Sequence, residues 1–262
     1  MRRWIAISTM LCALVTAAAA LSAAEARWRP SPGDGFDWQY TQPFNLERTP
    51  STINLDAFDA ERGTIQRLRA RGVTSICYVN IGAWEDWRPD KHQFPPAILG
   101  KNYVGWPGER WLDVRRTDIL LPIMRARFQL CRDKGFRAIE VDNLDAFETD
   151  TGFRISRAEQ VHYNRLIAAE AHAVGLSIAQ KNAPGLVPDL VDHYDFLIAE
   201  DCFKWNWCGE LRPYVAQGKA VVTIEYPEDG RNPLQHCAEA AALGIQIVVK
   251  RRKLDSWAQR CR

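Results

Sequence analysis

Eight short apolar runs, separated by amphipathic helical stretches, most constrain how this 262-residue chain can fold. The clearest run is Ala138–Asp142, which is rich in apolar residues and ends in an acid, and Phe196–Glu200 repeats that design. Such runs are typical of strands buried on both faces of a parallel sheet. Because strands alternating with helices indicate βα units, and eight such strands close a barrel, we predict an α/β fold, a single (β/α)8 barrel of the TIM type.

The predicted strands follow one another through the whole chain. They are Phe36–Tyr40, Ile53–Asp56, Ser75–Gly82, Ala138–Asp142, Leu176–Lys181, Phe196–Glu200, Ala220–Tyr226 and Ile245–Lys250. A capping box at Ser156 and Glu159 predicts a helix that Gly175 ends. A long insertion after the third strand, rich in Trp and Pro, is expected to form an ordered loop over the active face. The alternative is a peripheral subdomain, in which Trp111–Val114 is a short extra strand.

Composition and charge narrow the classes of partner. The 34 basic and 32 acidic residues nearly cancel, and no Lys/Arg block that would track a phosphate backbone occurs, so nucleic acid is not an expected partner. Arg2 and Arg3 precede an apolar stretch and small residues, which predicts a secretory signal peptide over residues 1–26. A membrane anchor is the alternative. We expect a secreted or periplasmic monomer, with residues 27–262 as its single domain and no stable membrane insertion after cleavage.

Six cysteines remain after the predicted cleavage, an even number that suits an oxidising compartment. The short spacing of Cys202 and Cys208 favours a disulfide between them, and a bond from Cys237 to Cys261 is the second choice. The other two cysteines, Cys77 and Cys131, are expected to be either bonded or buried thiols. Because no C-x-x-C or H-x-H spacing occurs, neither a metal nor another cofactor is expected.

Polar and aromatic side chains end nearly every predicted strand. At the carboxyl end of a barrel such residues converge, and unpaired polar groups there are costly unless they bind one another, water or a ligand. Helix capping or packing is the alternative role for each of them. The candidates for substrate binding are Trp38, Tyr40, Asp56, Tyr78, Asn80, Asn143, Lys181, Asn182, Asp201 and Tyr226.

Asp142 and Glu200 differ from these candidates because each directly follows a strongly apolar strand. A pair of carboxyl groups on barrel strands suggests glycoside hydrolysis, in which one group donates a proton and the other attacks the sugar or activates water. Their separation decides between retention and inversion, and the sequence does not supply it. Glu140 points to the same side as Asp142 but one pleat deeper, so its expected role is support. Asp145 lies beyond the strand.

Several segments together resemble glycoside hydrolase family 114. They are Trp38-Gln39-Tyr40, the run Cys77–Asp90 with its N-x-G-x-x-E-x-x-R-x-D element, Glu140–Asn143, Gln180-Lys181-Asn182 and Ala199-Glu200. The resemblance implies a (β/α)8 barrel with endo-α-1,4-polygalactosaminidase activity. It also implies that Asp142 is the nucleophile of a retaining mechanism and Glu200 the general acid/base, and it adds Glu85 and Arg88 to the expected substrate-binding residues.

The implied substrate is a cationic galactosamine-containing polysaccharide, which acids around the barrel mouth would attract. Those acids are Asp56, Glu85, Asp86, Asp145 and Asp201, and about half are expected to pair instead with arginines such as Arg88, Arg115 and Arg116. Aromatic rings would stack on sugars, and the candidates are Trp38, Tyr78, Trp84 and Tyr226.

Two other functions remain open at this point. One is a non-catalytic barrel whose acids only hold a cationic polysaccharide, because a fold does not fix an activity. The other is a metal-dependent polysaccharide deacetylase, which would need clustered His and Asp ligands. None of the five histidines lies at a predicted strand end.

Overall fold

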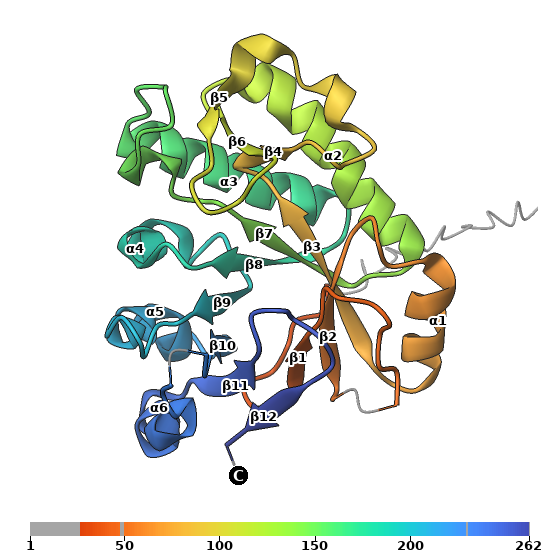
Figure 1. The fold of residues 1–262 in the computed structure, drawn as a ribbon, viewed down its shortest axis with the longest axis vertical. Helices are drawn as coiled ribbons and strands as arrows, with labels where there is room; N and C mark the ends of the chain where they lie inside the picture. The colour runs from red at the N-terminus through yellow and green to blue at the C-terminus, as the bar shows by residue number, and fades with distance from the viewer. Residues whose placement is uncertain (1–26, 48–49, 229, 262) are drawn as a thin grey trace, which may run out of the picture.

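Eight parallel strands form the barrel of the computed structural model, which describes residues 27–47, 50–228 and 230–261 (Figure 1). The predicted signal segment lies outside these residues. The parallel strands are β1 (Phe36–Trp38), β2 (Thr52–Asp56), β3 (Thr74–Asn80), β7 (Ala138–Asp142), β8 (Ser177–Lys181), β9 (Phe196–Glu200), β10 (Val221–Glu225) and β11 (Gln246–Lys250). A ninth strand, β12 (Ala258–Arg260), pairs with β11 in the antiparallel sense. The eight predicted strands are confirmed.

Helices surround this sheet on the outside (Figure 1). They are α1 (Arg62–Ala70), α2 (Thr117–Lys134), α3 (Arg157–Ala173), α4 (Val187–Leu190), α5 (Arg212–Ala216) and α6 (Cys237–Leu243). Short 3₁₀ helices lie at Lys91–Gln93, Pro96–Ile98, Ala146–Glu148, Pro184–Leu186, Cys208–Leu211 and Pro233–His236. The predicted capping box begins α3, where the Ser156 backbone N–H donates to Glu159 at 2.7 Å and the Glu159 N–H donates back to the Ser156 hydroxyl.

The barrel is nearly closed at the seam between β1 and β11. Among the described residues, the two strands share no backbone ladder, and side chains join them instead. Lys250 Nζ lies 2.8 Å from Asp37 Oδ1, and Arg260 on β12 donates to the Phe36 carbonyl at 2.8 Å. The loop after β11 also contributes, because the Leu254 carbonyl accepts the backbone N–H of Tyr40 at 3.0 Å.

Alternation along the strands separates an apolar barrel floor from a polar mouth. Side chains at every second position point inward, and a buried inner cluster that includes Phe36, Ile76, Ala138 and Ile198 fills the lower barrel. The inward-pointing positions near the carboxyl ends of the strands hold acids, amides and aromatic rings, which face one another at the mouth. A larger apolar cluster packs the outer faces of the strands against the helices.

The insertion after β3 forms a three-stranded antiparallel sheet rather than an irregular loop. Its strands are β4 (Ala83–Glu85), β5 (Leu99–Asn102) and β6 (Glu109–Leu112), in the order β4-β6-β5. The predicted extra strand at Trp111–Val114 overlaps β6. Gly82 packs against Asn143 so closely that an added Cβ would lie 1.9 Å from the Asn143 carbonyl oxygen. A glycine is therefore needed where the insertion leaves the barrel.

Three disulfide bonds tie the described part of the chain. Cys202–Cys208 and Cys237–Cys261 agree with the two expected pairs, and Cys77–Cys131 joins β3 to α2. Within the described ranges, no helix combines the length and apolar character needed to span a membrane.

Candidate active site

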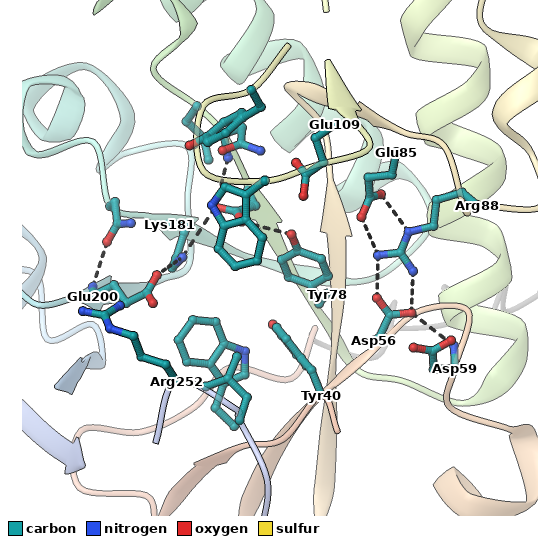
Figure 2. A pocket seen from close by; sticks show the side chains of 18 of the residues that line it. Tyr40, Asp56, Asp59, Tyr78, Glu85, Arg88, Glu109, Lys181, Glu200 and Arg252 are labelled. Carbon is teal, nitrogen blue, oxygen red and sulfur yellow. Dashed lines mark hydrogen bonds and ion pairs between the residues drawn. The ribbon is translucent and has the colours of Figure 1, made fainter. Parts of the chain in front are cut away.

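A cavity of about 440 Å³ opens at the mouth of the barrel (Figure 2). This volume lies within the range of roughly 300–1,000 Å³ that ligand pockets occupy. Strand ends and the insertion supply its walls. The predicted site residues among its lining are Trp38, Tyr40, Asp56, Tyr78, Glu85, Arg88, Asp142, Asn143, Lys181, Asn182 and Glu200.

Lys181 joins the two predicted catalytic acids. Its Nζ lies 3.5 Å from Asp142 Oδ1 and 2.9 Å from Glu200 Oε2. These distances are two sides of a triangle, so the two carboxylate oxygens lie at most about 6.4 Å apart. The Lys181 ammonium also lies 5.0 Å from the centre of the Trp38 ring, a cation–π contact at the cavity floor.

Asp142 and Glu200 are each fixed by further hydrogen bonds. The Tyr78 hydroxyl donates to Asp142 Oδ2 at 3.0 Å, and the Asn143 backbone N–H donates to Asp142 Oδ1 at 3.0 Å. The Tyr226 hydroxyl donates to Glu200 Oε1. Asp142 and Glu200 therefore lie in defined orientations on neighbouring parts of the rim, with the ends of β7 and β9 holding them.

The charge state of Glu200 reflects two opposing effects. Burial favours the protonated form, but the Lys181 charge and the hydrogen bond from Tyr226 favour the carboxylate, and the net effect lowers the pKa of Glu200 below its ordinary value. The pKa of Lys181 is raised, because the neighbouring acids outweigh its own burial. The site thus holds an ionised Glu200 beside a charged Lys181.

The residue after each member of this trio has a left-handed backbone. Asn143, Asn182 and Asp201 have φ values of 63°, 47° and 54°. Asn and Asp tolerate this conformation better than other residues with a Cβ. It turns the chain sharply at the end of β7, β8 and β9, so that the last side chain of each strand stands at the rim.

Glu140 lies beneath the trio, as its position one pleat deeper predicts. It is fully buried and accepts hydrogen bonds from the Tyr40 hydroxyl at 3.2 Å and from Asn54. Burial raises its pKa to about 8, although Lys181 opposes this effect. Glu140 therefore holds a proton at neutral pH and adds little negative charge under Asp142.

One wall of the cavity is an ion-pair cluster centred on Arg88 (Figure 2). The guanidinium lies 2.7 Å from both Asp56 Oδ2 and Glu85 Oε1, and all three side chains are buried. Arg88 was expected to bind substrate, but its hydrogen bonds go to these two acids. The pairing matches the expectation that part of the acidic rim is neutralised by arginine. Arg115 and Arg116 pair elsewhere, with Asp113 and Asp118.

Three predicted substrate-binding residues lie outside the cavity lining. Asn80 is 1% exposed, and its side-chain oxygen accepts the Ala83 backbone N–H at 2.8 Å. Asp201 pairs with Arg252 at 2.8 Å, while Tyr226 is buried against Glu200. Each of the three contacts a residue of the lining, namely Glu109, Arg252 or Glu200, and their binding of substrate stays a prediction.

The insertion and the loops after β2, β7 and β11 supply further wall residues, of which only Asp145 was expected near the mouth. These additional lining residues are Asp59, Trp87, Tyr103, Trp106, Glu109, Leu144, Asp145, Arg252, Lys253 and Leu254. Trp87 and Trp106 are 51% and 60% exposed, which suits stacking against a sugar ring. The Trp-rich composition of the insertion was the available signal. Trp84, an expected stacking residue, instead donates its indole N–H to the Lys91 carbonyl at 3.1 Å and does not line this cavity.

Within the part of the chain that the structure describes, no group of three potential metal ligands closes around a point in the cavity. Its lining contains no histidine among the described residues. One group of three ligand-type side chains occurs within the described ranges, formed by Cys202, Cys208 and Glu225. The two sulfurs of this group are bonded to each other, so neither is a thiolate that a metal would require.

Comparisons with known proteins identify the family to which this chain belongs. The model of glycoside hydrolase family GH114 matches residues 17–262. The chain belongs to family GH114. It is accordingly a glycoside hydrolase, and the resemblance expected from its motifs is confirmed.

Two solved structures and one curated sequence are similar to this chain. The crystal structure of Aspergillus fumigatus Ega3 in complex with galactosamine is 29% identical, covers 90% of this chain and 98% of its own, and has a TM-score of 0.83. The glycoside hydrolase domain of PelA from Pseudomonas aeruginosa shares the fold at 17% identity, with a TM-score of 0.66 over 87% of this chain and 97% of that domain. An uncharacterised protein of Deinococcus radiodurans is 27% identical over 82% of this chain and 76% of its own.

Proposed function

We propose that this GH114 enzyme cleaves within α-1,4-linked galactosamine-containing polysaccharide, with Asp142 as nucleophile and Glu200 as general acid/base. The observation that carries the proposal is the pair of carboxylates joined by Lys181 at the floor of the cavity. The substrate class is supported by the galactosamine bound to Ega3. The structural match to Ega3 covers 90% of this chain and 98% of the Ega3 chain. The exposed Trp87 and Trp106 would extend the binding surface along a polymer.

The distance between the carboxylates supports retention of anomeric configuration. Retaining enzymes hold their two carboxyl groups about 5–5.5 Å apart, whereas inverting enzymes need roughly 6.5–9.5 Å to admit a water molecule. The two Lys181 contacts keep Asp142 Oδ1 within about 6.4 Å of Glu200 Oε2, just below the inverting range, and this bound supports direct attack by one carboxylate. In this mechanism Asp142 attacks the anomeric carbon, and the same Glu200 first protonates the leaving oxygen and then deprotonates water.

The acid role requires Glu200 to gain a proton, which the Lys181 contact opposes. Lys181 Nζ already lies within 3.5 Å of Asp142 and needs only a small movement to favour that side. We infer that a bound sugar draws Lys181 toward Asp142, which keeps the nucleophile ionised and lets the pKa of Glu200 rise. The direction of this change is what general acid catalysis needs.

Digestion of partially deacetylated galactosamine polymer tests the activity. The wild type should release internal fragments of mixed length, and Asp142→Asn or Glu200→Gln should lower the rate by about 100-fold to 10,000-fold, the usual contribution of such groups. Glu210→Gln is the matched control, because Glu210 is exposed and lies outside the cavity lining. Cleavage by both active-site variants at the wild-type rate would refute the assignment.

Azide separates the two catalytic roles. With an activated α-glycoside, an Asp142→Gly variant rescued by azide should form the β-glycosyl azide, because azide replaces the missing nucleophile. A Glu200→Ala variant should form the α-glycosyl azide, because azide then attacks a β-linked glycosyl-enzyme. The opposite stereochemistry would exchange the roles of Asp142 and Glu200.

The same assays distinguish the alternative functions. Binding of the polymer without cleavage by the wild type would favour a carbohydrate-binding barrel. Release of acetate that a chelator abolishes would favour a metal-dependent deacetylase. Neither outcome is expected if the carboxylate pair performs the reaction.

The proposed enzyme is secreted or periplasmic and acts as a monomer made of residues 27–262. Three disulfides in the described part of the chain support an oxidising compartment. Amino-terminal sequencing of the exported protein tests the cleavage site, with Arg27 as the expected first residue. Its mass by light scattering tests the oligomeric state.

A further inference from the structure

Glu109 is a buried acid whose charge the protein does not balance with a direct cation. It is 8% exposed and lines the active-site cavity, and among the described residues its carboxylate accepts one hydrogen bond, from the Asn80 side-chain amide at 3.2 Å. Among the described residues no lysine, arginine or histidine forms an ion pair with it. Figure 2 shows its carboxylate between the Lys181–Glu200 pair and the Arg88 cluster, joined to neither.

The local sheet makes this acid costly. Glu109 on β6 lies directly opposite Glu85 on the antiparallel strand β4, and like charges in this position destabilise a sheet. Arg88 neutralises Glu85 with two hydrogen bonds of 2.7 Å each. Glu109 is left with a burial penalty and a like-charged neighbour, which together with Asp142 raise its pKa to about 8. A structural role alone does not account for a carboxylate at this position.

A short hydrogen-bond network locates Glu109 relative to the reacting centre. The Asn80 amide that contacts Glu109 also accepts, through its oxygen, the Asn143 side-chain N–H at 3.0 Å. Asn143 directly follows Asp142, the proposed nucleophile. A sugar whose anomeric carbon lies at Asp142 would carry its C2 substituent one carbon away, in the cavity that Asp142 and Glu109 both line.

We propose that Glu109 binds the C2 ammonium of the galactosamine unit at Asp142 and makes the enzyme prefer this unit without an acetyl group. The inference rests on the proposed function. A carboxylate gains a charge-assisted hydrogen bond from an ammonium, whereas a neutral N-acetyl group supplies no positive charge to draw the proton off Glu109 or to offset its burial. Glu109 is thus a specificity-determining residue, because it binds the C2 substituent beside the anomeric carbon whose glycosidic bond is cleaved.

A pair of matched oligosaccharides tests the proposal. Wild type, Glu109→Gln and the exposed control Glu210→Gln are compared on α-1,4-linked galactosamine oligomers, either free or fully N-acetylated. Glu109→Gln should lose at least tenfold in kcat/KM on the free amine and little on the acetylated oligomer. Equal losses on both oligomers, or no loss on the free amine, would overturn the role of Glu109. If the wild type cleaves neither oligomer, the proposed function itself fails.

Calorimetry provides a readout that does not depend on turnover. At pH 6.5, where the amine is protonated and Glu109 largely holds its proton, galactosamine binding should release a proton as Glu109 ionises. The heat of binding in buffers of different ionisation enthalpy measures this release. N-acetylgalactosamine should release none, and Glu109→Gln should abolish the effect for galactosamine. Proton release that persists unchanged in Glu109→Gln would contradict the proposal.

Discussion

Replacing Lys181 by methionine tests how the cavity balances its charges. The Lys181 side chain is 4% exposed, and its Nζ lies 2.9 Å from Glu200 and 3.5 Å from Asp142. Removing one partner of a buried ion pair typically costs about 3–5 kcal/mol of unfolding free energy. Because methionine keeps most of the side-chain volume, we expect a loss of this size near pH 8 to report the missing charge.

The loss should shrink as the pH falls. Burial pushes the pKa of Glu200 upward, but Lys181 brings it below its ordinary value. In the wild type, Glu200 therefore contributes stability that is present above its unfolded pKa and lost only as the pH falls through its lower folded pKa. Without Lys181, burial raises the pKa of Glu200 and raises that of Glu140 further above about 8. The folded variant then takes up protons that the folded wild type does not, and each one reduces the difference by up to about 1.4 kcal/mol per pH unit.

Urea unfolding at pH 5, 6.5 and 8, followed by tryptophan fluorescence, measures this dependence. The difference between wild type and Lys181→Met should be smaller at pH 5 than at pH 8 by at least about 1.4 kcal/mol. Lys219→Met is the matched control, since the Lys219 ammonium donates to backbone carbonyls such as that of Tyr194 at 2.8 Å. A difference for Lys181→Met that stays constant from pH 5 to pH 8 would refute the reasoning.

Three further substitutions probe other parts of the fold. Arg88→Met leaves two buried acids unpaired, so we expect unfolding free energy to fall by about 3–5 kcal/mol in urea titrations, and a change below about 1 kcal/mol would contradict the cluster's importance. Trp106→Ala removes a ring that is 60% exposed; KM for long polymer should rise while the melting temperature stays within error, and an unchanged KM would exclude Trp106 from polymer binding. Ser156→Ala removes the α3 cap and should cost about 1 kcal/mol without changing kcat, whereas altered turnover would argue against a purely structural cap.

The barrel strands were predictable because each apolar run stops at a polar residue. The bounds of Ala138–Asp142 and Phe196–Glu200 agree with β7 and β9 at both ends. The first strand is shorter than expected and ends at Trp38, since the Tyr40 backbone N–H bonds to the Leu254 carbonyl instead of continuing a ladder. That partner comes from the opposite end of the chain, and local sequence carries no signal for it.

The candidate site likewise contains some residues that strand ends predict and others that depend on distant parts of the chain. Asp142, Lys181 and Glu200 were identified from strand ends, and the structure brings them together at one cavity. Glu109 was missed because it belongs to a hairpin strand that lies over the barrel, and Arg252 was missed because it comes from a loop after the last parallel strand. Their positions depend on how the insertion and the chain end pack, which periodicity along a strand does not encode.

The seam between β1 and β11 bears on aggregation. A barrel that lacks a ladder at one junction has strand edges whose N–H and C=O groups are able to template pairing with another chain. Here β12 covers the free side of β11, and the Cys237–Cys261 disulfide fastens the residue that follows β12 to the start of α6. The tail therefore protects the edge of β11 from pairing with another chain. Reduction of the Cys237–Cys261 disulfide would let β12 detach and would expose the edge of β11 to intermolecular pairing.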